Sequence, residues 1–171
     1  MHRAAAEFAR QLTELSHEIG RQIAASRTVC DAHGCTLIVN DHWRAAIAAG
    51  ANFVHLGQED LAAADVAAIK AAGLKLGLST HSPEELEIAL AVEPDYVALG
   101  PIWETKLKAM TWAPQGLDRV RAWKARIGTL PLVAIGGITP ERAPAAVAAG
   151  ADSLAVITDF FTYAEPEARI R

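Results

Sequence analysis

Short apolar runs alternate with amphipathic segments along most of the chain. The apolar runs predict strands buried on both faces of a sheet, and they lie at 36–39, 53–56, 74–78, 96–99, 132–135 and 153–157. The amphipathic segments predict helices at 4–29, 43–49, 61–72, 83–92 and 117–127, another that ends at Gly150, and the start of a last one from about 159. Strands that alternate with helices in this way predict an α/β fold with a parallel sheet.

Glycines close several of the predicted helices. Gly50, Gly73 and Gly150 each stand between an alanine-rich helix end and the next apolar run, where glycine favours the left-handed conformation that ends a helix. Right-handed crossovers between such units allow either an open doubly wound sheet or a closed barrel. The six predicted strands are fewer than the roughly eight that a closed barrel needs.

Length and composition narrow the class of protein. The 171 residues favour one domain over 1–171, with a leading helix (1–35), βα units (36–160) and a truncated last helix (161–171). A net charge of -4 argues against general affinity for nucleic acid or an anionic membrane. No apolar run approaches the roughly 18 residues of a membrane helix, and no signal peptide is visible. Together with two cysteines that we expect to be reduced, Cys30 and Cys35, this predicts a cytoplasmic protein.

Two carboxylates follow successive predicted strands. Asp41 comes after the run at 36–39, and Asp60 comes shortly after the run at 53–56, with Asn40 and Gln58 nearby. Oxygen ligands of this kind suit Mg²⁺, which keeps several waters and is often shared with a phosphate group. The alternative is that both aspartates cap the helices that follow them.

Several other residues near predicted strand ends could bind an anion. Lys106 and Lys108 lie in a long connection after the fourth strand, where they could hold a phosphate or be ordinary solvated lysines. Gly136 and Gly137 follow the fifth strand and precede a predicted helix start at Thr139-Pro140-Glu141, so their N–H groups could approach a phosphate. The hydroxyls of Ser79 and Thr158 could donate to phosphate oxygens, or they could serve as helix caps or turn residues.

Three histidines and two tryptophans complete the candidates. His42, His55 and His81 could do acid–base work, although His55 could equally be a structural histidine of the strand. Trp103 and Trp112 could cover a heterocyclic ligand, or could simply pack.

Six motifs in order give the chain a family resemblance. They are Asn40-Asp41, HLGQED at 55–60, GLSTH at 77–81, ALGPI at 98–102, APQGL at 113–117 and VAIGGI at 133–138. The series resembles thiamine phosphate synthase over roughly 36–160. The resemblance implies a TIM (β/α)8-type barrel, incomplete here with about six βα units. It also implies a transferase of thiamine biosynthesis that joins hydroxymethylpyrimidine pyrophosphate to thiazole phosphate, releases pyrophosphate and uses Mg²⁺.

The resemblance also implies roles for single residues. Asp41 and Asp60 would bind Mg²⁺, and Asn40 would contact the pyrimidine. Ser79 and Lys108 would hold the pyrophosphate during catalysis. The remaining positions would bind substrate, chiefly thiazole phosphate, and they are Thr105, Lys106, Leu107, Gly137, Ile157 and Thr158.

The chain departs from the family pattern in two places. The loop usually reads Pro-Thr-x-Thr-Lys, whereas Glu104 and Leu107 stand here in place of a proline and a threonine. The family's Gln-x-Arg-x-Lys strand element has no counterpart before the leading helix, so we expect the first strands of a barrel to be absent and a homo-oligomer to cover the open edge. A catalytically impaired remnant that only binds phosphate ligands is the alternative, and a thiazole tautomerase fits less well because both aspartates are present.

Overall fold

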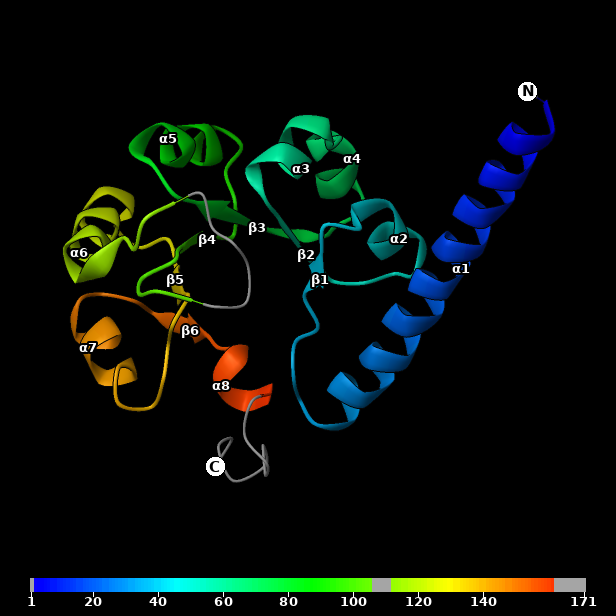
Figure 1. Ribbon diagram of the computed structural model, residues 1–171. Helices are drawn as coiled ribbons and strands as arrows, with labels where there is room; N and C mark the ends of the chain where they lie inside the picture. The colour runs from blue at the N-terminus through cyan, green and yellow to red at the C-terminus, as the bar shows by residue number, and fades with distance from the viewer. Residues whose placement is uncertain (1, 106–111, 162–171) are drawn as a thin grey trace. The chain divides into compact units, whose positions relative to one another are not determined.

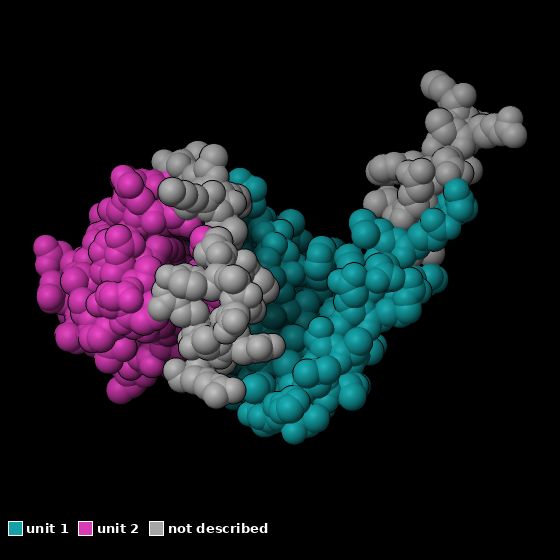
Figure 2. All heavy atoms as spheres, turned by 60° about the horizontal axis from the view of Figure 1, so that its bottom comes forward, with its two compact units in different colours: residues 1–76 teal, residues 77–171 magenta. Residues whose placement is uncertain are grey.

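The computed structural model describes residues 2–105 and 112–161 and divides into two compact units, residues 1–76 and 77–171 (Figure 2). The strands follow the order of the sequence from β1 to β6, and they alternate with helices (Figure 1). The predicted α/β class with six parallel strands is confirmed.

The first unit contains a long helix and two parallel strands. Its elements are α1 (His2–Ala32), β1 (Val39–Asn40), α2 (Trp43–Ala48), β2 (Phe53–Leu56), α3 (Gln58–Ala63) and α4 (Val66–Ala71). The strands pair in parallel, with Val39 opposite Val54 and Asn40 opposite His55. Val54, Leu56 and Ile69 are fully buried and form the centre of this unit.

An arginine of α1 ties that helix to α2. The Arg27 guanidinium Nη1 donates to the carbonyls of Ala49 and Gly50, at 2.7 and 3.0 Å, and these carbonyls lie just beyond the C-terminus of α2. Cations at this end of a helix also interact favourably with its dipole. On α1, Ile23 is buried, whereas Leu15 is 56% exposed.

The second unit repeats the strand–helix pattern. Strand β3 (Lys75–Thr80) begins at the end of the first unit, and α5 (Pro83–Ala91), β4 (Tyr96–Leu99), α6 (Gly116–Ile127), β5 (Leu132–Ile135), α7 (Ala143–Ala148), β6 (Ser153–Ala155) and α8 (Thr158–Phe161) follow. Successive strands from β3 to β6 pair in parallel. Helices α5, α6 and α7 lie along one side of these strands (Figure 1). The core between these layers includes Leu78, Leu99, Leu132 and Val120, all fully buried.

Several predicted boundaries are wrong, and each has a local cause. The strand predicted at 36–39 begins only at Val39, which is the one residue of that run that is paired and buried, while Ile38 is 41% exposed. The single helix predicted at 61–72 is broken, because the Asp65 carboxylate accepts the N–H of Ala68 at 2.9 Å and starts α4 as a new helix. The sixth strand is shorter than predicted and ends at Ala155.

Other predicted elements agree closely with the structure. Strands at 53–56, 96–99 and 132–135 have the predicted bounds. The predicted cap of α5 is confirmed, since Ser82 is its N-cap and Pro83 its first residue. The leading helix is longer than predicted, and of the predicted last helix the structure describes the four residues of α8. No helix among the described residues is long and apolar enough to cross a membrane.

Candidate functional site

Asp41 lies directly after β1 in an unusual backbone conformation. Its φ is 63°, in the left-handed region, which aspartate tolerates better than most residues. Its N–H donates to the His55 carbonyl at 2.9 Å, and its own carbonyl accepts the N–H of Trp43 at 2.8 Å. These bonds hold the chain in a conformation that is typical of functional sites when the residue is not glycine.

The side chain of Asp41 is oriented by its neighbour. The Asn40 Nδ2 donates to Asp41 Oδ2 at 2.6 Å. Asp41 itself is half-buried and Asn40 is exposed. The amide therefore orients the carboxylate of a residue that is partly exposed at the strand end, where its oxygens are suitable cation ligands.

Asp60 has a different setting from the predicted strand end. It lies in the first turn of α3, its side chain is exposed, and Gly57 precedes the helix as N-cap. A Cβ placed on Gly57 would lie 3.3 Å from Asp60 Oδ2, so the carboxylate folds back over the turn that follows β2. The alternative that the two aspartates are helix caps is wrong, because the N-caps of α2 and α3 are His42 and Gly57.

The donor set of this unit fits Mg²⁺ better than zinc. Asp41 and Asp60 offer carboxylate oxygens, and within 2–105 and 112–161 no three or more histidine, cysteine, aspartate and glutamate side chains are placed so that together they could hold a metal ion. Structural and catalytic zinc sites use such a cluster of nitrogen and sulfur ligands. Mg²⁺ needs only one or two carboxylates beside waters and a phosphate group.

His55, at the third position of β2, is held neutral. Burial lowers the pKa of its imidazole to about 4, because a charged ring would lose its hydration. At neutral pH the ring therefore carries no charge. A ring with so low a pKa is a poor acid–base catalyst at neutral pH, so the alternative of a structural histidine in the strand fits His55 better.

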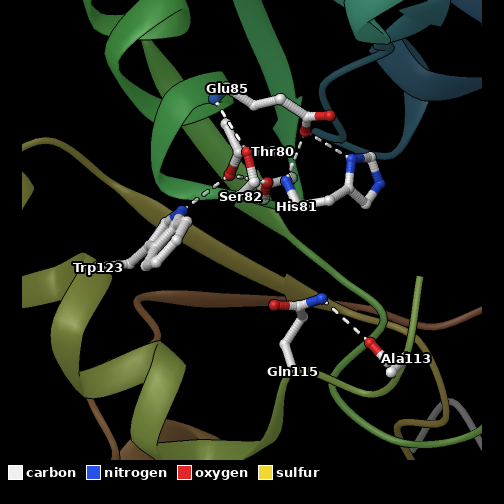
Figure 3. Close-up of polar contacts among 8 residues, drawn as sticks. Thr80, His81, Ser82, Glu85, Ala113, Gln115 and Trp123 are labelled. Carbon is white, nitrogen blue, oxygen red and sulfur yellow. Dashed lines mark hydrogen bonds and ion pairs between the residues drawn. The ribbon is translucent and has the colours of Figure 1, made fainter.

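Ser79 and Thr80 occupy the end of β3. Thr80 is fully buried, and its Oγ1 donates to the carbonyl of Ala98 in β4 at 2.9 Å while accepting the indole N–H of Trp123 in α6 at 2.9 Å (Figure 3). Because side chains alternate along a strand, Ser79 points to the face opposite α6. Ser79 is part of β3 rather than of the loop after it.

The ring of His81 is held from two sides. Its Nδ1 lies 2.8 Å from Glu85 Oε2, and its backbone N–H donates to the same oxygen at 2.7 Å (Figure 3). The ring also stacks on Trp112, with centroids 5.5 Å apart and planes 5° from parallel. Glu85 was not predicted as a site residue, although it closes the Ser82-x-x-Glu85 pattern that marks a helix start.

The long connection after β4 is closed at its base. The N–H of Gln115 donates to the Pro101 carbonyl at 2.7 Å, and the N–H of Gly116 donates to the Ile102 carbonyl at 3.0 Å. Thr105 is half-buried and Glu104 is exposed. The predicted residues Lys106, Leu107 and Lys108 lie outside the described residues.

Gly136 and Gly137 form a tight turn after β5. Gly137 has a φ of 64°, and a Cβ there would lie 2.6 Å from the Glu104 carbonyl oxygen and 2.9 Å from Trp103 Cβ. The Gly137 carbonyl accepts Arg142 Nη1 at 2.8 Å, and the Arg142 guanidinium lies over the Trp103 ring. The turn is therefore packed against the start of the loop after β4.

The predicted helix start beside this turn is wrong. Helix α7 begins at Ala143, and its N-cap is Arg142 rather than Thr139. The Thr139 carbonyl accepts the N–H groups of Arg142 and Ala143. Gly136 and Gly137 thus present their own N–H groups and no helix terminus. Ile157 is 42% exposed after β6, and Thr158 is the first residue of α8.

Comparisons with known proteins identify the family. The profile described as Thiamine monophosphate synthase matches residues 9–160. The thiamine-phosphate synthase of Rhizobium etli is 61% identical over 150 residues, which cover 88% of this chain and 74% of that protein. This chain belongs to the thiamine monophosphate synthase family. The predicted family is confirmed.

Two further relatives agree with this assignment. The thiamine-phosphate synthase of Neisseria meningitidis serogroup B is 51% identical over 154 residues, covering 90% of this chain and 75% of that protein. The structure of a thiamine phosphate pyrophosphorylase from Pyrococcus furiosus has a TM-score of 0.78 and 26% identity, covering 90% of this chain and 73% of that one. The thiamine monophosphate synthase fold seen here is compatible with an incomplete TIM-type barrel.

Proposed function

We propose that this protein is a thiamine-phosphate synthase, a transferase that condenses hydroxymethylpyrimidine pyrophosphate with thiazole phosphate and releases pyrophosphate. The observation that carries the proposal is the 61% identity to the Rhizobium etli thiamine-phosphate synthase over 88% of the chain. At this identity the residues at the strand ends are expected to retain their chemistry.

Each candidate residue is assigned a role in this reaction. Asp41 and Asp60 bind Mg²⁺, and Asn40, which orients the Asp41 carboxylate, also contacts the pyrimidine. Ser79 and Lys108 hold the pyrophosphate. The thiazole phosphate is bound by residues of three segments of the chain, namely Thr105, Lys106, Leu107, Gly137, Ile157 and Thr158.

The chemistry needs charge neutralisation more than proton transfer. Bound Mg²⁺ would neutralise negative charge on the pyrophosphate oxygens. The Lys108 ammonium and the Ser79 hydroxyl stabilise the charge that collects on the same group as its bond to the pyrimidine methylene breaks. The thiazole nitrogen then forms the new bond to that methylene. The protein orients the two substrates for this step and excludes competing reactions.

A neutral His55 agrees with this proposal. Its pKa of about 4 leaves it uncharged at neutral pH, so it neither repels Mg²⁺ nor competes with Mg²⁺ for the Asp41 carboxylate. It would serve to shape the strand end beside Asp41, whose N–H its carbonyl accepts.

Product formation tests the proposal directly. The purified protein is mixed with both phosphate substrates and Mg²⁺, and thiamine phosphate and pyrophosphate are quantified by chromatography over time. We expect equimolar formation of the two products, and none when Mg²⁺ is removed by a chelator. No thiamine phosphate at an enzyme concentration equal to that of the substrates would reject the activity, and binding of either substrate without turnover would favour the phosphate-binding remnant.

Two expectations concern the protein in the cell. We expect a cytoplasmic location, where small phosphorylated substrates are made, and self-association into a homo-oligomer. Sedimentation of the purified protein measures the second, and a monomer at micromolar concentration would contradict it.

A further inference from the structure

We propose that His81 binds the pyrophosphate group of the substrate through its Nε2, as a neighbour of Ser79 on the same strand end. This inference rests on the proposed function, because it names a further residue of the pyrophosphate site. Two observations support it. Glu85 and Trp112 fix the His81 ring, and the ring lies two residues from Ser79 at the end of β3.

Glu85 fixes the ring of His81. The single oxygen Oε2 of Glu85 lies 2.8 Å from His81 Nδ1 and accepts the His81 backbone N–H at 2.7 Å. Both side chains are less than one-fifth exposed, at 19% and 18%. A carboxylate that accepts from Nδ1 sets the tautomer of the ring and leaves Nε2 as the nitrogen that can meet a ligand.

Trp112 restrains the plane of the His81 ring. Its ring stacks on that of His81 with planes 5° from parallel and centroids 5.5 Å apart. The hydrogen bond to Glu85 restrains the position of the ring edge, and the stacking restrains the plane. A ring held in both ways loses little further side-chain entropy when it binds a ligand.

Ser79 and His81 both lie at the C-terminal end of β3, two residues apart. Pairing with β4 continues to the last residue of the strand, where the Thr80 carbonyl accepts the N–H of Gly100. The Thr80 side chain points toward α6 and is bonded to Trp123, and Figure 3 shows the His81 ring directed away from Trp123. His81 follows the last residue of β3 at a bend, and its ring is held beside α5 by Glu85.

The chemistry of the ring suits an anion. Among the residues that the structure describes, Nε2 of His81 has no hydrogen-bond partner, whereas Nδ1 is committed to Glu85. A phosphate oxygen at Nε2 would place the ring between two anionic acceptors, Glu85 at Nδ1 and the ligand at Nε2, and a ring that donates from both nitrogens forms charge-assisted hydrogen bonds to both. Pyrophosphate gains negative charge as it departs, so this bond strengthens during the reaction.

Binding of inorganic pyrophosphate tests the inference without turnover. Isothermal titration calorimetry in Mg²⁺ buffer compares the wild-type protein with His81→Phe, which keeps a flat ring for Trp112 and removes both ring nitrogens. We expect pyrophosphate affinity to fall on the order of tenfold to a hundredfold, the effect of losing one charge-assisted hydrogen bond. His33→Phe, in the exposed turn after α1, is the matched control and should bind as the wild type does.

A second variant covers the case in which His81→Phe does not fold. Glu85→Gln keeps the size of the side chain and removes the charge that orients the ring, and we expect several-fold weaker pyrophosphate binding with an unchanged melting temperature. Wild-type affinity in either folded variant overturns the inference.

The outcome is separable from that of the proposed function. Pyrophosphate binding that depends on His81 in a protein that forms no thiamine phosphate would keep this inference and reject the activity. A protein that forms thiamine phosphate but binds pyrophosphate equally well in the His81→Phe variant would keep the activity and overturn this inference. A wild-type protein that does not bind pyrophosphate overturns it as well.

Discussion

Gly137 is the residue at which backbone geometry and the proposed thiazole phosphate site coincide. Its positive φ and its close approach to the Glu104 carbonyl oxygen and to Trp103 leave no room for a Cβ. A side chain at Gly137 would force both the backbone conformation and the contact with Glu104 to change. An L-residue rarely adopts this positive φ, and the atom nearest to the added Cβ is a backbone oxygen.

Gly137→Ala is therefore expected to destabilise the protein and to weaken substrate binding. We predict a loss of about 1–3 kcal/mol in the free energy of unfolding, measured by urea denaturation. The KM for thiazole phosphate should rise more than that for the pyrimidine substrate. An alanine variant with wild-type stability and wild-type KM values would show that the turn tolerates a side chain.

His55 makes stability depend on pH in the mildly acidic range. Its folded-state pKa of about 4 lies below the usual value of 6.5, so the unfolded chain binds the proton more readily. The stabilisation is present in full above about pH 6.5 and is lost as the pH falls toward about 4.

Between about pH 7.5 and pH 5 we predict a loss of about 2 kcal/mol in the free energy of unfolding, an upper bound because the ring is only partly buried. Urea denaturation at both pH values measures this loss. The His55→Leu variant removes the titrating group and should lose less stability over the same interval. Equal losses in the two proteins would contradict the assignment to His55.

At the scale of elements, Thr80 connects three pieces of the second unit. Its hydroxyl donates to β4 at Ala98 and accepts from Trp123 of α6. Trp123 is 4% exposed, so its indole N–H cannot turn to water if the hydroxyl is removed. A buried donor without an acceptor destabilises a fold more than the loss of an average hydrogen bond.

Thr80→Val should therefore lower the free energy of unfolding by about 1–3 kcal/mol, although it preserves the shape of the side chain. Thr80→Ser is the matched control, since it keeps the hydroxyl and loses only one methyl group, worth about 1 kcal/mol. Both values come from chemical denaturation. A valine variant as stable as the serine variant would mean that the hydroxyl contributes little.

The elements whose bounds the sequence predicted best are short strands made of apolar residues, because burial in the sheet decides where they begin and end. The strands at 96–99 and 132–135 are short, apolar and buried, and their bounds match the structure. The helix predicted at 61–72 failed because Asp65 caps a new helix, and a side-chain cap inside an alanine-rich segment leaves no mark in hydrophobic periodicity. The strand predicted at 36–39 is shorter in the structure because Ile38 is 41% exposed and Val39 alone of that run is buried.

The site was predictable where a residue follows its strand directly. Asp41 lies at such a position, and its amide neighbour Asn40 was identified with it. Asp60 was placed at a strand end but lies in the first turn of α3. The contact between His81 and Glu85 is local, and the Ser82-x-x-Glu85 pattern marks the helix start but not the bond to the ring. The packing of Gly137 against Glu104 joins residues far apart in the sequence, which hydrophobic periodicity cannot predict.

At the level of the whole molecule, the activity of the family depends on a few carboxylate oxygens that we assign to Mg²⁺. The chain spans about three-quarters of its curated relatives, 74% of the Rhizobium etli protein and 75% of the Neisseria protein. The central claim is that this chain makes thiamine phosphate with Mg²⁺ bound by carboxylates of the first unit. Asp41 is the best residue at which to test it, because asparagine also tolerates its left-handed conformation.

Turnover of the Asp41→Asn variant over a Mg²⁺ titration is the most direct measurement. The variant removes one charge and keeps the backbone geometry, and Asp31→Asn, at the exposed end of α1, serves as the charge-matched control. We predict that kcat/KM for thiamine phosphate formation falls about a hundredfold or more in Asp41→Asn, with a higher Mg²⁺ requirement, and stays at the wild-type value in Asp31→Asn. Wild-type turnover by Asp41→Asn at every Mg²⁺ concentration would contradict the account.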